Sequence, residues 1–110
     1  MKILILLLTG VFAFGQTNAE MKEEADKRFT KVDKQLNVVY QQLMSEVKTE
    51  VKYHRKIIST QKIWLQFRNL HCECESQKHE GGSMESLIYI ECLTQLTLQR
   101  IKELKSLKSY

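Results

Sequence analysis

The sequence has no proline and only four glycines, so few residues in it interrupt a helix. Gly10 and Gly15 lie near the start of the chain, and Gly81 and Gly82 are adjacent. Proline breaks helices because it lacks a backbone N–H and clashes with the preceding turn, and glycine weakens them entropically. The rest of the chain is rich in Lys, Glu, Gln and Leu, which are good helix formers. The composition therefore predicts long helices.

Long apolar runs are also lacking, apart from one at the N-terminus. Residues 3–14 are apolar except for one Thr and one Gly, and they follow a single lysine. This pattern is typical of a secretory signal peptide and falls short of the about 20 residues that span a bilayer. Cleavage fits after Gly15 or after Ala19, and no cysteine stands there to carry a lipid anchor. We therefore expect a signal peptide over residues 1–19 and one periplasmic or secreted domain over residues 20–110, without membrane insertion.

Charge is distributed unevenly along the expected mature chain. Residues 46–68 carry a net charge of +4, whereas residues 69–91 carry −4. The negative segment contains a single base, Lys78, and five acids: Glu73, Glu75, Glu80, Glu85 and Glu91. Nucleic acid is not an expected partner, because the chain is exported and basic residues do not alternate with aromatic ones.

Apolar residues recur at helical spacing along the first two thirds of the mature chain. The first series is Ala25, Phe29, Val32, Leu36, Val39, Leu43, Val47 and Val51; the second is Ile57, Ile58, Gln61, Trp64, Leu65, Arg68 and Cys72. A single helix over residues 20–75 would be about 84 Å long at 1.5 Å per residue, and the remaining chain could cover only half of it. We therefore predict a break within residues 48–55.

A third helix is predicted after the only evident loop, residues 76–83. Ser83 is a good N-cap candidate, and Glu85 suits the first turn because the helix dipole favours acids there. The expected helix covers residues 84–107, with inward positions at Leu87, Ile88, Cys92, Leu96, Leu104 and Leu107. The fold class that follows is all-α, an antiparallel three-helix bundle.

The three cysteines allow one disulfide between the second and third helices. Cysteines of exported proteins are commonly oxidised, and small domains often need such a cross-link. Cys72 and Cys92 fall at comparable depths of the hairpin, so we expect them to pair, with Cys74 as the rival partner of Cys92. A metal site using His71, Cys72, Cys74 and His79 is a weaker alternative, because Cys-x-Cys departs from the usual Cys-x-x-Cys spacing. A nucleophilic cysteine is weaker still, since adjacent helix residues point in different directions.

Several short motifs resemble the LprI-type lysozyme-inhibitor family. The residues that carry the resemblance are Asp33, Leu36, Asn37, Tyr40, Gln61, Trp64, Arg68, Cys72, Gly81, Gly82, Tyr89, Cys92, Leu93, Arg100 and Leu104. The resemblance implies an all-helical exported protein that binds and inhibits lysozyme. Many relatives carry a cysteine early in the first helix, which this chain lacks, whereas Cys74 is additional. Most motif residues look structural: we expect Trp64 in the core and one polar network between helices formed by Asp33, Asn37, Gln61 and Arg68.

These observations favour a binding protein over an enzyme, with no cofactor. The acids of residues 69–91 lack the apolar surroundings that raise a carboxyl pKa for catalysis. We expect the hairpin tip, with Glu73, Glu75, Glu80 and His79, to press into the basic cleft of a lysozyme. The alternative is a structural, interaction or metal-binding module of the cell envelope with no lysozyme target.

Overall fold

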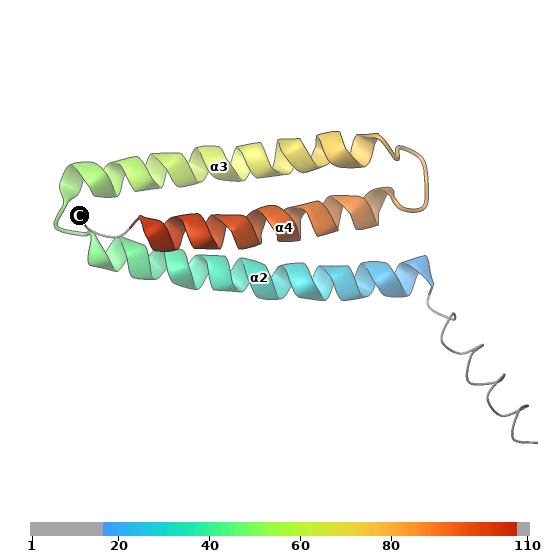
Figure 1. Cartoon of the computed structure of the whole chain (residues 1–110), viewed down its shortest axis with the longest axis horizontal. Helices are drawn as coiled ribbons and strands as arrows, with labels where there is room; N and C mark the ends of the chain where they lie inside the picture. The colour runs from blue at the N-terminus through green and yellow to red at the C-terminus, as the bar shows by residue number, and fades with distance from the viewer. Residues whose placement is uncertain (1–16, 108–110) are drawn as a thin grey trace, which may run out of the picture.

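The computed structural model describes residues 17–107 and contains three helices: α2 (Asn18–Glu46), α3 (Val51–Gln77) and α4 (Glu85–Ser106). Successive helices run in opposite directions, and α4 lies between α2 and α3 in Figure 1. No strand occurs among the described residues. The predicted antiparallel three-helix bundle is therefore confirmed. Most of the expected signal peptide, residues 1–16, lies outside the described part.

Helix α2 begins at a side-chain N-cap. The Thr17 hydroxyl accepts a hydrogen bond of 3.1 Å from the backbone N–H of Glu20, which satisfies one of the free donors of the first turn. The predicted apolar face is directed inward: its buried members are Ala25, Val32, Leu36, Leu43 and Val47. Val51 departs from the expectation, because it starts α3 and is 56 % exposed.

The chain reverses between α2 and α3 within residues 47–50, which overlaps the predicted break. The Val47 N–H donates to the Leu43 carbonyl, and the Glu50 N–H donates to the Val47 carbonyl. Val47 is fully buried and Ile57 nearly so, so the reversal folds over an apolar core. That core combines all three helices, and its buried members are Val32, Leu36, Leu43, Val47, Ile57, Ile101 and Leu104.

Helix α4 is buried on a different face from the predicted one. Of the predicted inward positions only Leu104 is fully buried, and the others are partly exposed. The buried residues are Ile90, Leu93, Thr94, Thr97, Arg100, Ile101 and Leu104. Because α4 contacts α2 on one side and α3 on the other, its contact face includes threonine and arginine positions that an apolar pattern does not reveal.

Candidate functional site

One disulfide joins α3 to α4 close to the hairpin between them. Cys72 and Cys92 are bonded, with their Cα atoms 5.5 Å apart, and Cys74 is a free, exposed thiol. The predicted pairing is confirmed, and the rival through Cys74 is wrong. Helix geometry explains the choice, because Cys72 shares the buried face of α3 with Arg68 and Ser76. Cys74, two residues further on, points to solvent.

The hairpin tip, residues 78–84, is organised by its two glycines and by Glu85. Gly81 has a φ of +78°, a left-handed conformation that strains other residues. Its N–H donates a 2.9 Å hydrogen bond to the Glu85 carboxylate. The prediction that Ser83 caps the third helix is wrong: Met84 occupies that position, and no side chain caps the helix. Glu85 instead bonds back into the turn.

The end of α3 and the hairpin tip carry exposed charge. Glu73 and Glu80 are exposed and take part in no ion pair among residues 17–107, whereas Glu75 lies 3.4 Å from Lys78. His79 is exposed as well, and Glu91 pairs with Arg28 of α2. The four predicted contact residues of the tip therefore share one exposed end of the bundle without converging on a cleft.

Sequence reasoning missed the acids that α2 contributes to this end. The first turns of α2 lie beside the α3–α4 hairpin, so they bring Glu20 and Glu24 to the same end of the molecule (Figure 1). A shallow hollow lined by Lys22 of α2, Glu73 of α3 and Glu85 of α4 marks the place where the three helices meet. Because the net charge of residues 20–45 is zero, the net charge of each segment of the sequence does not reveal these acids. We call this end, with Glu20, Glu24, Glu73, Glu75, Glu80 and Glu85, the acidic end.

The opposite end of the bundle is basic. It contains Lys48, Lys52, Arg55, Lys56, Lys102 and Lys105 from the α2–α3 reversal, the start of α3 and the end of α4. Three acids, Glu46, Glu50 and Glu103, lie among them, and Glu103 is paired with Arg100. The folded molecule therefore separates charge along its length, and a charged partner would be drawn to one end.

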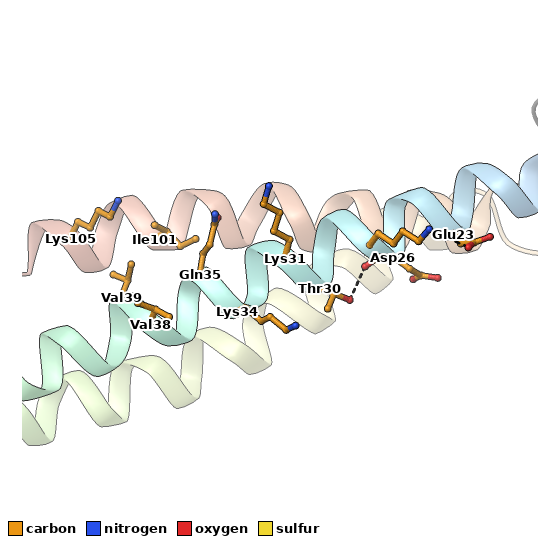
Figure 2. A pocket seen from close by; sticks show the side chains of 11 residues that line it. Glu23, Asp26, Thr30, Lys31, Lys34, Gln35, Val38, Val39, Ile101 and Lys105 are labelled. Carbon is orange, nitrogen blue, oxygen red and sulfur yellow. Dashed lines mark hydrogen bonds and ion pairs between the residues drawn. The ribbon is translucent and has the colours of Figure 1, made fainter. Parts of the chain in front are cut away.

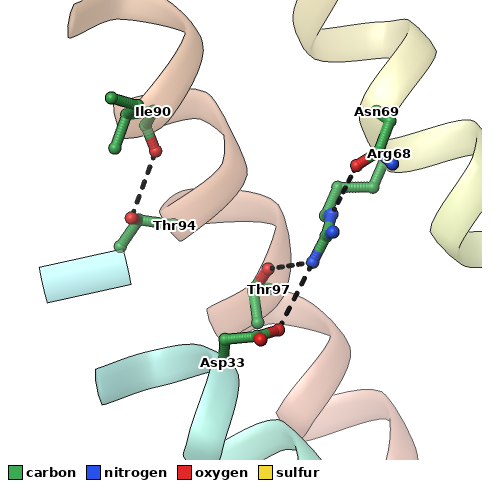
Figure 3. A network of polar contacts seen from close by, with 6 residues as sticks. All are labelled: Asp33, Arg68, Asn69, Ile90, Thr94 and Thr97. Atoms are coloured by element: carbon green, nitrogen blue, oxygen red, sulfur yellow. Dashed lines mark hydrogen bonds and ion pairs between the residues drawn. The ribbon is translucent and has the colours of Figure 1, made fainter. Parts of the chain in front are cut away.

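Halfway along the bundle, Arg68 joins all three helices. It is 8 % exposed and lies 3.7 Å from Asp33 of α2, and it donates a 3.3 Å hydrogen bond to the Thr97 hydroxyl of α4 (Figure 3). Its Nε donates to the side-chain oxygen of the adjacent Asn69. Burial lowers the pKa of the Arg68 guanidinium, while the charge of Asp33 acts in the opposite direction. An arginine stays protonated under such a shift, so this is a fixed, buried cation.

Trp64 separates Arg68 from a second buried arginine. The guanidinium carbons of Arg68 and Arg100 lie 5.3 Å and 5.7 Å from the Trp64 ring centroid, within cation–π range. Arg100 also donates to Gln61 at 3.0 Å and to Glu103 at 3.2 Å, and its Nη2 is buried with no hydrogen-bond partner among the described residues. The indole face offers that guanidinium an electrostatic contact in place of a hydrogen bond. Trp64 itself is only partly buried.

The remaining motif residues have simpler environments. Leu36 is buried in the core, and Tyr40 is partly buried against it. Asn37 is exposed and forms no hydrogen bond within the described residues, so the structure does not include it in a network with Asp33, Gln61 and Arg68. The polar residues instead form two clusters, one around Arg68 and one around Arg100, with Trp64 between them.

An open groove between α2 and α4 has a volume of about 830 Å³ (Figure 2). Val38, Val39 and Ile101 supply its apolar part, and lysines stand along its edges. Neither a histidine nor a cysteine is among the residues that line the groove, and its two carboxylates, Glu23 and Asp26, are each paired with a lysine.

Among residues 17–107, no group of three or more His, Cys, Asp or Glu side chains is arranged to hold a metal ion, and the disulfide removes Cys72 from any such set. None of the described helices combines the length and the apolar character needed to cross a membrane.

Comparison with known proteins identifies the family. The sequence model described as "Lysozyme inhibitor LprI" matches residues 13–104, which include α2, α3 and all but the last two residues of α4. The chain belongs to the LprI lysozyme-inhibitor family. A curated relative, "Uncharacterized protein R02472" of Rhizobium meliloti (strain 1021), is 29 % identical over 94 residues, covering 76 % of this chain and 68 % of the relative. No solved structure matches. Membership of the LprI family points to a binding protein, because its named activity is inhibition.

Proposed function

We propose that the protein is exported, is not an enzyme, and inhibits a lysozyme by binding it through the acidic end. Family membership supports the class of activity. The separation of charge along the bundle supports the choice of surface. A cationic enzyme would be repelled by the basic end and attracted to the acidic end, although the net charge of the whole sequence is +4.

The geometry of the tip suits inhibition by occlusion. The disulfide, the Gly81 turn and the bond from Gly81 to Glu85 hold the hairpin in one conformation. A rigid surface loses little conformational entropy on binding, so more of the contact energy appears as affinity. Glu73 and Glu80 form no ion pair within residues 17–107, so no ion pair of that part of the chain would have to break before they meet a cationic partner.

The test is to measure inhibition of lysozyme by the purified mature protein and by two sets of glutamine variants. The first set, Glu73→Gln, Glu75→Gln and Glu80→Gln, changes the acidic end. The matched control, Glu46→Gln with Glu50→Gln, removes acids from the basic end. Charges at the rim of an interface act mainly on association, so the first set should slow association and flatten its dependence on salt. For each charge removed, the control should change neither the rate of association nor its dependence on salt.

Two outcomes would contradict the proposal. If the unmodified protein does not inhibit the lysozyme tested at low or at moderate salt, the proposal fails for that enzyme. The alternative, an interaction module of the cell envelope, is then favoured. Equal effects of the two sets would place the contact surface elsewhere. Circular dichroism of every variant must match the parent, because a loss of helix would also abolish binding.

A further inference from the structure

Helix α3 presents an apolar row to solvent on the side away from the core. Ile63, Phe67 and Leu70 are 66 %, 53 % and 61 % exposed. Their spacing of four and three residues aligns them along one side of the helix, and the exposed Cys74 extends the row by a further turn. The buried residues of α3, among them Arg68, lie on the other side. Large apolar side chains grouped in this way mark an interaction surface more often than scattered ones do.

Two pairs of opposite charges near this row are placed symmetrically about its middle. Lys62 and Glu73 lie at equal distances in sequence on either side of the Phe67–Arg68 pair. Arg55 and Glu80 are also equidistant from that pair, with Glu80 in the turn that follows α3. None of these four side chains takes part in an ion pair within residues 17–107. Both bases are exposed, as are both acids, so all four are available to a partner.

This symmetry is complementary to itself. If a second copy of α3 packs against the row in the antiparallel direction, each base of one copy lies opposite an acid of the other. Because of the two-fold symmetry, every such contact then occurs twice, as in an isologous dimer. A parallel arrangement would instead bring like charges together. Spacing of four and three residues is also the pattern with which helices interdigitate in coiled coils.

We propose that the outer face of α3 is a dimer interface, in which the rows Ile63–Phe67–Leu70 of two copies pack antiparallel. Three apolar side chains per copy cover less than the roughly 800 Å² per partner of a standard interface. The dimer is therefore weak and reversible, and it forms at micromolar or higher concentrations. Glu73 and Glu80 face the second copy in it, so a lysozyme would compete with dimerisation for these acids. The assays below contain no lysozyme, so their failure is independent of the proposed function.

The antiparallel arrangement also decides where Cys74 lies. With Lys62 opposite Glu73, Cys74 lies about 3 Å along the helix axis from the position opposite Ile63, the nearest residue of the facing row, and it is well separated from Cys74 of the second copy. An Ile63→Cys variant should therefore form an intermolecular disulfide with Cys74 under mild oxidation by oxidised glutathione. Val51→Cys provides a matched control, because Val51 is similarly exposed on α3 but lies outside the row. Ile63→Cys combined with Cys74→Ser should also give no cross-linked dimer.

Sedimentation measurements, together with variants that reverse the charges of an intermolecular ion pair, test the dimer. The mature protein should shift from monomer to dimer as its concentration rises, whereas Phe67→Glu should remain monomeric. Val38→Glu, which changes a similarly exposed site on α2, should still form the dimer. Lys62→Glu should raise the dissociation constant by about tenfold, since two ion pairs become repulsive, and adding Glu73→Lys should restore it. A protein that stays monomeric at every concentration would overturn the proposal. So would preferential Cys74–Cys74 cross-linking, or a charge exchange that restores nothing.

Discussion

Replacing Cys92 with serine should lower the free energy of unfolding by about 3 kcal/mol. The disulfide joins residues 20 apart in sequence, and the loop-closure model assigns such a loop about 3 kcal/mol at 25 °C. Cys92 is the better site to change, because it is partly exposed whereas Cys72 is fully buried. The substitution therefore removes the cross-link with little loss of packing.

Urea denaturation followed by circular dichroism measures this difference. For a domain of this size, the change corresponds to a fall in melting temperature of roughly 12–24 °C. Cys74→Ser is the control, because the Cys74 thiol is free and exposed and its removal should change stability by less than about 0.5 kcal/mol. Reducing agent should lower the stability of the parent to that of Cys92→Ser and leave the variant unchanged. Equal stability of the oxidised parent and the variant would refute the reasoning.

Four further substitutions test the interior and the turn by the same denaturation assay. Trp64→Ala should cost about 3 kcal/mol, near the low end for a tryptophan because the ring is partly exposed, and the parent's fluorescence should be blue-shifted from free tryptophan. Asp33→Asn should cost about 1–3 kcal/mol by removing the charge that faces the buried Arg68, and an unchanged midpoint would mean that this ion pair contributes nothing. Gly81→Ala should cost about 1 kcal/mol because Gly81 has a positive φ. Gly82→Ala should cost less, because its added Cβ meets only the His79 carbonyl, at 3.2 Å. A larger cost for Gly82→Ala than for Gly81→Ala would contradict this account of the turn.

Much of the fold could be read from the sequence because apolar spacing and the near absence of helix breakers are local signals. The inward face of α2 and the reversal near residue 48 follow from helical periodicity combined with chain length. The comparable depths of Cys72 and Cys92 in the hairpin favoured their pairing, with Cys74 left as the rival partner of Cys92. The predictions failed where the local pattern was ambiguous. Ser83 looked like a cap but is not one, because Glu85 bonds back to Gly81 and the helix begins one residue later. The inward face of α4 was misplaced because its central threonines and Arg100 are buried only through contact with two flanking helices.

The candidate site was predictable in part for the same reason. The acids of residues 69–91 are adjacent in sequence, so their common location at the hairpin could be expected. The addition of Glu20 and Glu24 could not, because it depends on the antiparallel return of α3 and α4 past the start of α2 (Figure 1). The Trp64 arrangement is similar: Arg68 is one helical turn from Trp64, but Arg100 belongs to another helix, and only packing brings it to the ring.

The sequence by itself determined that this protein is helical, that it contains three helices and that one disulfide joins the last two, because these features depend on periodicity, breakers and cysteine position. Only the tertiary structure decided which helix lies in the middle, which polar residues are buried and which apolar residues remain outside. Ile63, Phe67 and Leu70 resemble core residues in composition, yet they lie in solvent because α3 has neighbours on one side only. Burial depends on which helices pack against one another, and the sequence pattern of a single helix does not specify this.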